Sequence, residues 1–183
     1  TRVVGRRGAG ERASCAGAEI GHEKGPGGDS DELRVAGREL VERIETFPKA
    51  VVAAVRGWCI GGGTGLAWPC DIRIASDTAR FRAGDVYLGI IPTWSVGMVR
   101  LVHYIGRNRT LDLMLLGEDF TAAEALELGI VSRVVADADF DSEVRRIADR
   151  LASCAPLSIR AIKEAVRAQC LEGFDRAHLV EAA

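Results

Sequence analysis

The sequence predicts an α/β fold, because strand-like and helix-like segments alternate along the chain. The run Val51–Val55 is short, apolar and β-branched, as expected of a buried strand. The preceding segment, Leu33–Phe47, places apolar residues at helical spacing and is followed by Pro48, which ends a helix. The chain has 183 residues and no internal repeat or linker, so we expect one domain with a substantial core.

The elements of the first half follow from short local patterns. Thr1–Val4 is strand-like and leads into a turn at residues 8–10, and the polar, glycine-rich stretch Glu23–Ser30 predicts a loop. After the buried strand, the glycine triplet at 61–63 predicts a turn from which a helix can start. The remaining elements predicted here are the helix Thr64–Trp68, the strands Asp71–Ala75 and Arg80–Arg82, and a loop that contains Asp85.

The second half is predicted to be mainly helical. Thr121 and Glu124 have the spacing of a capping box, and Pro156 suits the first turn of a helix. Ile130–Val135 has the character of a strand, which keeps the α/β alternation. The helices predicted in this half are Ser95–Ile105, Arg109–Leu116, Thr121–Leu128, Phe140–Ala155 and Pro156–Gln169.

Composition excludes several classes of function. The net charge of −2 gives no electrostatic reason to expect nucleic acid or a membrane surface as a partner. No apolar run approaches the length of a membrane-spanning helix. Five cysteines without a Cys-x-x-Cys pair favour reduced thiols and a cytoplasmic location. Three scattered histidines lack the spacing of metal ligands, so we expect no metal site.

The glycine triplet Gly61-Gly62-Gly63 is the most informative motif. Without Cβ atoms, the backbone here can approach another molecule closely, and the N–H groups of a following helix suit an anion or a developing oxyanion. The spacing fits neither a dinucleotide-binding fingerprint nor a P-loop. From the triplet alone, a helix start packed tightly on a strand is an equal alternative.

A second loop upstream has a similar character. Ser14–Glu19 combines Gly17 with small residues, and two such loops could each direct one N–H to a single carbonyl oxygen. Together the two segments resemble the crotonase (enoyl-CoA hydratase/isomerase) superfamily, in which Cys-Ala-Gly-Ala-Asp and Gly-Gly-Gly supply the halves of an oxyanion hole. The resemblance continues in the same order through Cys70–Ser76, Leu88–Pro92 and Gly117–Val131.

The resemblance implies a crotonase-like spiral of ββα units with C-terminal helices, truncated at both ends relative to the family. It implies a core with the acyl-CoA site in residues 1–135. Residues 136–183 would form a C-terminal helical region of the same domain, used in a homotrimer or hexamer. Arg6 and Arg7 stand where the family's strand is usually apolar, and Ser14 replaces a usual aromatic residue.

The resemblance also implies the chemistry of the site. The main-chain N–H groups of Ala18 and Gly62 would bind a thioester carbonyl as it becomes an enolate. The substrate is then an acyl thioester of coenzyme A, which needs no separate cofactor. Lys24 could meet a phosphate of coenzyme A, although a solvated lysine is the simpler interpretation.

The acidic residues discriminate between reactions. Hydratases of the family carry two glutamates, and the corresponding positions here are Gly65, without a side chain, and Asp85. A single acid resembles the Δ3,Δ2-enoyl-CoA isomerases, in which one carboxylate moves a proton between two carbons. We therefore expect isomerisation. Alternatives are hydration, decarboxylation or other enolate chemistry, a non-catalytic acyl-CoA-binding subunit and, for Asp85 itself, a structural carboxylate that caps the loop or pairs with Arg82.

The other candidates are weaker. Trp58, Tyr87 and Trp94 could shape an acyl pocket, whereas Trp68 suits the core. Thr93 lacks a base that would make it a nucleophile, His103 suits a surface or core position, and Asp71 is expected to orient backbone. Glu118 and Asp119 are predicted in a turn. The predicted substrate-binding residues are Ala16, Gly17, Trp58, Gly61, Gly65, Tyr87, Pro92 and Trp94.

Overall fold

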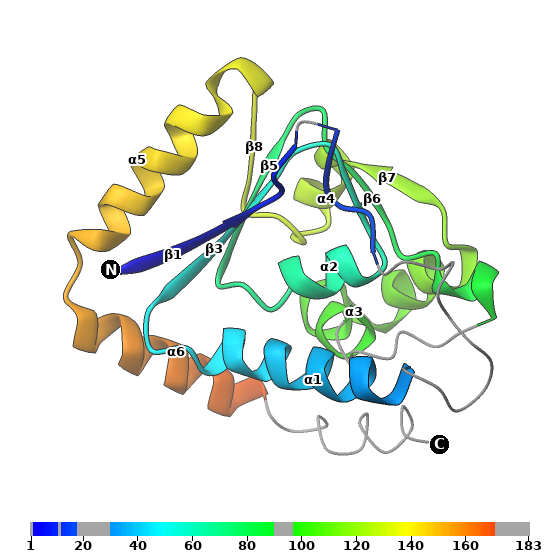
Figure 1. Ribbon diagram of the computed structural model, residues 1–183, viewed down its shortest axis with the longest axis horizontal. Helices are drawn as coiled ribbons and strands as arrows, with labels where there is room; N and C mark the ends of the chain where they lie inside the picture. The colour runs from blue at the N-terminus through cyan, green and yellow to red at the C-terminus, as the bar shows by residue number, and fades with distance from the viewer. Residues whose placement is uncertain (1, 11, 18–29, 90–96, 171–183) are drawn as a thin grey trace.

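Two four-stranded sheets organise the fold, and the chain passes back and forth between them (Figure 1). The computed structural model describes residues 2–10, 12–17, 30–89 and 97–170. All strand pairs are parallel except β6 with β7. The first sheet has the order β1 (Val3–Arg7), β3 (Ala50–Val55), β5 (Ile72–Ser76), β8 (Arg133–Val135). The second has the order β2 (Ala13–Cys15), β4 (Trp58–Ile60), β6 (Arg80–Arg82), β7 (Asp119–Thr121).

Helices surround these sheets and confirm the helical predictions closely. α5 packs against β1, β3 and β5, and α1 lies beside α6 (Figure 1). α3 is interrupted at Gly106, whose φ of 74° is not helical, so the two helices predicted for this stretch are confirmed. The helices are α1 (Ser30–Thr46), α2 (Gly62–Ala67), α3 (Gly97–Leu116), α4 (Ala122–Glu127), α5 (Phe140–Ala152) and α6 (Pro156–Cys170), with short 3-10 turns η2 (Asp85–Leu88) and η3 (Asp137–Asp139).

β3 lies at the centre of the core, and all six of its residues are buried. Its side chains alternate between two apolar clusters. Val52 and Ala54 pack with Phe140 of α5, whereas Val51 and Val55 face the larger cluster between the sheets and α2 to α4. Burial on both faces explains why this strand reads as a continuous apolar run without alternation.

Three strands were not predicted. β2, β4 and β7 have three residues each, so they carry little periodic signal, and each is paired with a segment distant in the chain. The interpretation of Asp119 as a turn residue is wrong, because it pairs with Arg82 across the antiparallel β6–β7 ladder. The predicted Thr1–Val4 strand is displaced, since β1 runs to Arg7 in register with Ala54 of β3.

The capping box and the role of Asp71 are confirmed. Thr121 and Glu124 form the capping box at the start of α4. Asp71 orients backbone as expected: its Oδ2 accepts the N–H of Val51 at 2.7 Å and pairs with Lys163 at 2.6 Å. All five cysteines are free thiols. Within the described ranges, no helix is long and apolar enough to cross a membrane.

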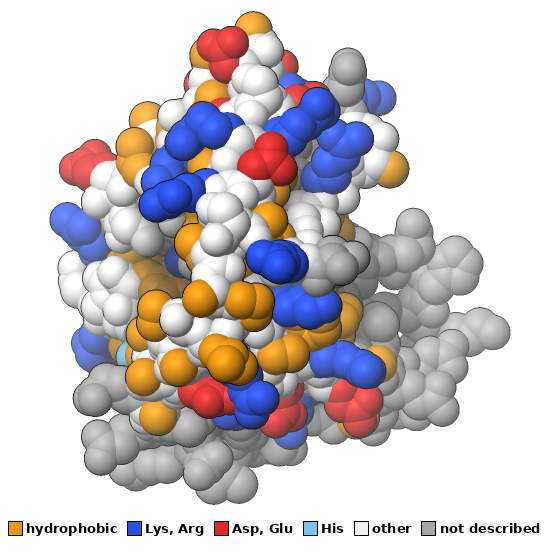
Figure 2. Space-filling view, turned by 90° about the vertical axis from the view of Figure 1, so that its left-hand side faces the viewer, with side chains coloured by type: hydrophobic (Ala, Val, Ile, Leu, Met, Phe, Trp, Pro, Cys, Tyr) orange, Lys and Arg blue, Asp and Glu red, His pale blue; other side chains and the backbone are white. Residues whose placement is uncertain are grey.

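Figure 2 views the side on which α5 and α6 lie, where hydrophobic side chains gather among Lys and Arg side chains. α6 contributes three exposed apolar residues to the surface of the molecule, Leu157, Ile162 and Val166.

Arg73 of β5 fixes the end of α2. It is 8% exposed and donates hydrogen bonds to the carbonyl oxygens of Trp68 (2.8 Å), Cys70 (2.6 Å) and Ile130 (2.5 Å). Its guanidinium also lies 4.6 Å from the ring centre of Tyr104. One buried cation therefore joins the last turn of α2 to the loop before β8.

Replacement of Arg73 by methionine is expected to lower the free energy of unfolding by roughly 3–5 kcal/mol, because three buried carbonyl groups lose their charged donor. Chemical denaturation measures this loss. Arg160→Met is the matched control, since Arg160 is 60% exposed in an i,i+4 pair with Glu164 and should change stability by less than about 0.5 kcal/mol. Equal losses in the two variants would contradict the assignment.

Candidate functional site

The glycine triplet consists of Gly61, which forms the turn between β4 and α2, and of the first two residues of α2. Gly61 has φ 50° and ψ −117°, a conformation that requires glycine, and its carbonyl oxygen accepts the N–H of Gly65 at 3.1 Å and the hydroxyl of Thr64 at 2.6 Å. These bonds start the helix at Gly62. The N–H groups of a first helical turn have no acceptor within the helix, so the N–H of Gly62 is a donor for another group.

The loop after β2 lies directly against this turn. Cys15 is in register with Cys59 of β4, and Gly17 follows with φ 98°. A Cβ at Gly17 would lie 3.2 Å from the oxygen of Ile60 and 3.6 Å from the nitrogen of Gly62. The two glycine loops predicted from the sequence are therefore in contact. Ala18, the second predicted donor, lies outside the described residues.

Gly63 keeps the two loops together, because a Cβ at this position would overlap the carbonyl oxygen of Cys15 and lie 3.0 Å from its Cβ. Gly63→Ala is expected to displace the Cys15 loop from α2. A displacement of about 1 Å can cost roughly 10²-fold in rate, so we expect a loss of that order in turnover of an acyl-CoA substrate. The control is Gly5→Ala, whose Cβ meets nothing within 4 Å and which should leave the rate unchanged.

Asp85 lies beside the same turn. It is the first residue of η2, and its Oδ1 is 3.8 Å from the position of a Cβ on Gly61. The N–H of Gly61 donates to the carbonyl oxygen of Arg82 at 3.1 Å, which joins the end of β6 to this turn. Asp85 follows β6 closely in the chain, so its carboxylate lies next to the Gly61–Gly62 peptide. Burial raises the pKa of the Asp85 carboxyl above its ordinary value.

The sequence left two structural alternatives for Asp85, a cap of its own loop and an ion pair with Arg82, and the structure contradicts the ion pair. Arg82 binds Asp119 through both of its carboxylate oxygens, at 2.5 and 2.9 Å. In the part of the chain that the structure describes, no cation forms an ion pair with Asp85. The carboxylate does have a hydrogen bond to the main chain of Asp85 itself, which lies within the turn. Gly65 is buried within α2 and supplies no carboxylate, and Asp119 is paired with Arg82. Glu118 is exposed.

The aromatic candidates separate into different environments. Trp68 is 1% exposed and belongs to the core, as predicted. Trp58 on β4 is 38% exposed, with the guanidinium of Arg82 6.0 Å from its ring centre. Tyr87 is 66% exposed and its hydroxyl donates to the carbonyl oxygen of Leu116. His103 is exposed on α3, and Ala16 is exposed beside Gly17. Lys24, Pro92, Thr93 and Trp94 lie outside the described residues.

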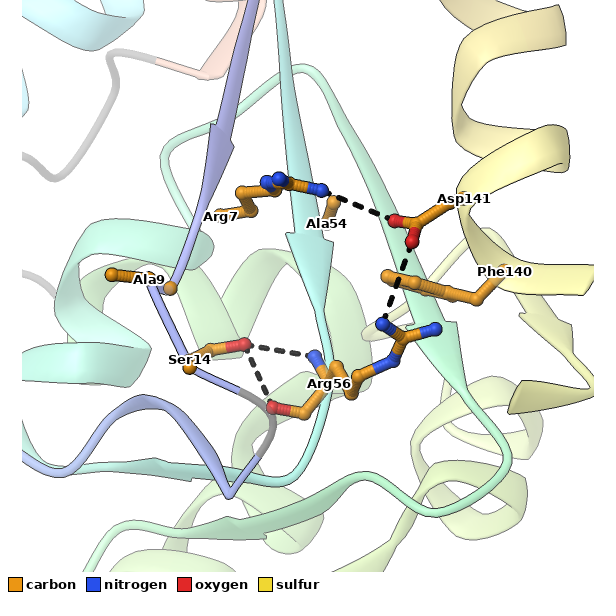
Figure 3. A pocket seen from close by; sticks show the side chains of 9 residues that line it. Arg7, Ala9, Ser14, Ala54, Arg56, Phe140 and Asp141 are labelled. Atoms are coloured by element: carbon orange, nitrogen blue, oxygen red, sulfur yellow. Dashed lines mark hydrogen bonds and ion pairs between the residues drawn. The ribbon is translucent and has the colours of Figure 1, made fainter. Parts of the chain in front are cut away.

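A polar pocket of about 210 Å³ lies elsewhere, between β1, β3 and the start of α5 (Figure 3). The Oγ of Ser14 accepts a hydrogen bond from the main-chain N–H of Arg56 at 2.8 Å and donates one to the main-chain carbonyl oxygen of Arg56 at 3.0 Å. The guanidinium groups of Arg7 and Arg56 both pair with Asp141, and Arg56 also binds Asp137. These polar groups satisfy one another. The sequence showed Ser14 only as a replacement for an aromatic residue, and nothing in it marked Arg56, Asp137 and Asp141.

No group of three or more His, Cys, Asp or Glu residues suited to a metal ion occurs among the described residues. The site predicted from the sequence consists of backbone N–H groups and a carboxylate. Such a combination can bind a carbonyl oxygen that gains negative charge and can move a proton beside it.

Comparison with known proteins identifies relatives along nearly the whole chain. A family model described as enoyl-CoA hydratase/isomerase matches residues 2–179. The short-chain-enoyl-CoA hydratase of Clostridium acetobutylicum is 36% identical over 160 residues, which cover 87% of this chain and 61% of that protein. The chain spans about three fifths of the length of the curated relatives it matches.

Solved structures share the fold. Enoyl-CoA hydratase from Bacillus anthracis superposes with a TM-score of 0.86 and 34% identity, over 97% of this chain and 72% of that chain. A structure from Thermobifida fusca in complex with CoA superposes with a TM-score of 0.81 and 31% identity, over 99% of this chain and 77% of that chain. The crotonase-like α/β fold predicted from the sequence is thereby confirmed.

Proposed function

The chain belongs to the enoyl-CoA hydratase/isomerase family, and from that premise we propose that it converts an acyl-CoA thioester through an enolate, with one carboxylate moving the proton. The observation that supports this most is the position of Asp85 beside the Gly61–Gly62 peptide, next to the loop that contains Gly17. The CoA ligand of the Thermobifida fusca structure supports a CoA thioester as substrate.

The proposed oxyanion hole consists of the N–H groups of Gly62 and Ala18. The contact between Gly17 and the nitrogen of Gly62 supports this pairing, since Ala18 follows Gly17 directly. Removal of an α-proton moves an electron pair into the thioester carbonyl, and the two donors would stabilise the negative charge on its oxygen. One such donor contributes about 2.7–4 kcal/mol to the transition state.

Asp85 is the proposed acid and base. In isomerisation of a 3-enoyl thioester, its carboxylate takes a proton from the α-carbon, and the resulting dienolate regains that proton at the γ-carbon to give the 2-enoyl thioester. No water is added, so one carboxylate is sufficient. A raised pKa suits this role, because it brings the pKa of the carboxyl closer to neutral pH. The ionised form can then accept a proton and the protonated form can return it.

Hydration is the second candidate, because the Clostridium and Bacillus relatives are named hydratases. Water addition in this family uses two glutamates, and Gly65 leaves the first of those positions without a side chain. Decarboxylation or other enolate chemistry, and an accessory subunit that only binds acyl-CoA, would use the same hole. The homotrimer or hexamer and the division at residue 135 stay predictions, the former testable by light scattering.

The experiment is mass spectrometry of 2-enoyl, 3-enoyl and aryl-substituted thioesters incubated with the protein in D₂O. Deuterium uptake or a shifted double bond without added water is the expected result. A product heavier by one water would favour hydration and would show that Gly65 does not prevent it. Binding without any exchange would favour the accessory subunit.

The pH dependence of exchange provides a further prediction. Asp85 must be ionised to accept a proton, so activity falls as the pH decreases through its pKa. Because burial raises that pKa, the acid limb of kcat/KM should lie above the value of about 3.9 that an exposed aspartate would give. Initial rates between pH 4 and 8 measure this limb. An acid limb at or below the ordinary value would contradict the assignment.

A further inference from the structure

The short turn η2, which contains Asp85, is attached to the C-terminal end of α3. Its own backbone bonds run from the N–H of Tyr87 to the oxygen of Gly84 (3.1 Å) and from the N–H of Gly89 to the oxygen of Val86 (3.2 Å). The hydroxyl of Tyr87 donates to the carbonyl oxygen of Leu116, the last residue of α3. A side-chain bond thus connects the turn to a segment almost thirty positions later in the chain.

The residue after Leu116 packs against the same turn. Gly117 has φ 61°, and a Cβ there would lie 2.9 Å from Cε2 of Tyr87, 3.1 Å from Cγ1 of Val86 and 3.4 Å from Cα of Gly84. Only a glycine permits this close approach. The segment from Leu116 to Gly117 therefore contacts the turn at three residues. Two of these, Gly84 and Val86, are the chain neighbours of Asp85.

A second connection lies just before the turn. Arg82, at the end of β6, binds Asp119 of β7 with both carboxylate oxygens. The turn is consequently flanked by one attachment at Arg82 and another at Tyr87, both made to residues 116–119. Asp85 forms no ion pair with any described residue, and its carboxylate has a hydrogen bond to its own main chain. The position of the carboxylate therefore depends on how the turn itself is held.

We infer that Tyr87 is a positioning residue, whose hydrogen bond to Leu116 keeps the Asp85 carboxylate beside Gly61. This inference rests on the proposed function for the part that Asp85 plays in proton transfer. It differs from the role predicted from the sequence, in which the Tyr87 ring shapes the acyl pocket. The two roles differ in outcome, because a pocket wall changes KM and acyl preference whereas a positioning residue changes kcat.

The test is Tyr87→Phe, which removes one hydroxyl and retains the ring. We expect kcat for α-proton exchange to fall about 5- to 20-fold, since small displacements of a catalytic group have large effects on rate, while KM stays within about twofold. Because Tyr87 acts through Asp85, the same substitution in an Asp85→Asn background should cause no further loss. A loss of equal size in that background would overturn the inference, as would an unchanged kcat or a change confined to KM.

Tyr104→Phe is the matched control, because the hydroxyl of Tyr104 also donates to a carbonyl oxygen, that of Trp68 at 2.9 Å, away from the Asp85 turn. It should lower stability without lowering kcat. An equal fall in kcat for both tyrosine variants would indicate a general structural effect and overturn the inference.

Amide hydrogen exchange separates this inference from the proposed function. Tyr87→Phe should accelerate exchange of the amides of Tyr87 and Gly89, which close the turn, but not that of Trp68, which bonds to Thr64 in α2. Unchanged exchange at the turn would overturn the inference even in an active enzyme. Accelerated exchange in a protein that turns over no thioester would mean that the proposed function fails while the attachment of the turn is correct.

Discussion

Asp85→Asn is expected to reduce α-proton exchange of a bound acyl-CoA by about 10²- to 10⁴-fold, the usual contribution of a positioned acid or base. The substitution keeps the size of the side chain and removes its ability to accept a proton. Asp85 pairs with no described cation, so no ion pair is broken, and the Kd for acyl-CoA should change by less than about threefold. Exchange measured by mass spectrometry in D₂O and binding measured by calorimetry give the two quantities.

Asp112→Asn is the control for this variant, since Asp112 is an exposed carboxylate on α3. It should have the exchange rate of the wild type. Exchange that persists in Asp85→Asn would show that another group transfers the proton. A loss of binding together with exchange would show instead that the carboxylate supports the site rather than the chemistry.

Gly62→Pro is expected to lower kcat by roughly 10²- to 10³-fold, because proline has no N–H and the developing oxyanion would lose one donor. Gly62 is the first residue of α2, and proline is tolerated at a first helical position, so the helix should be retained. Single-turnover kinetics with a 3-enoyl thioester measure the loss, and circular dichroism verifies the fold.

Gly62→Ala separates the donor from crowding at this position, because alanine adds a methyl group and keeps the N–H. We expect the alanine variant to be much more active than the proline variant. Equal losses in both would mean that space at residue 62, and not the N–H, limits the reaction, and the oxyanion assignment would then be wrong.

The sequence predicted those parts of the fold that local physics determines. Val51–Val55 reads as a buried strand because both of its faces lie in apolar clusters, and Thr121 with Glu124 specifies a helix start through bonds within four residues. β2 and β4 were not predicted, because their few residues become strands through pairing with segments distant in the chain, β2 with β4 and β4 with β6. Three residues are too few for the alternation of apolar and polar side chains to show in the sequence that such pairing occurs.

The same distinction applies to the site. The glycine triplet and Asp85 were recognisable through the family's motifs, and the contact of Gly17 with Gly62 follows from the positions of the two loops. The partners of Arg82 and Tyr87 were not predictable. Asp119 and Leu116 become neighbours of these side chains only when β7 and the end of α3 return to β6, which depends on the complete topology.

The alternation of the chain between two sheets has a consequence for the rate of folding. Val3 pairs with Ala50 and Ile74 pairs with Arg133, so each ladder of the first sheet closes only after the chain has visited the second sheet. Parallel pairings of this kind must overcome loop-closure entropy before their contacts contribute, and they give a high contact order. We therefore expect refolding from denaturant to be slow for a chain of this length, with unpaired strand edges exposed to aggregation until β1 joins β3.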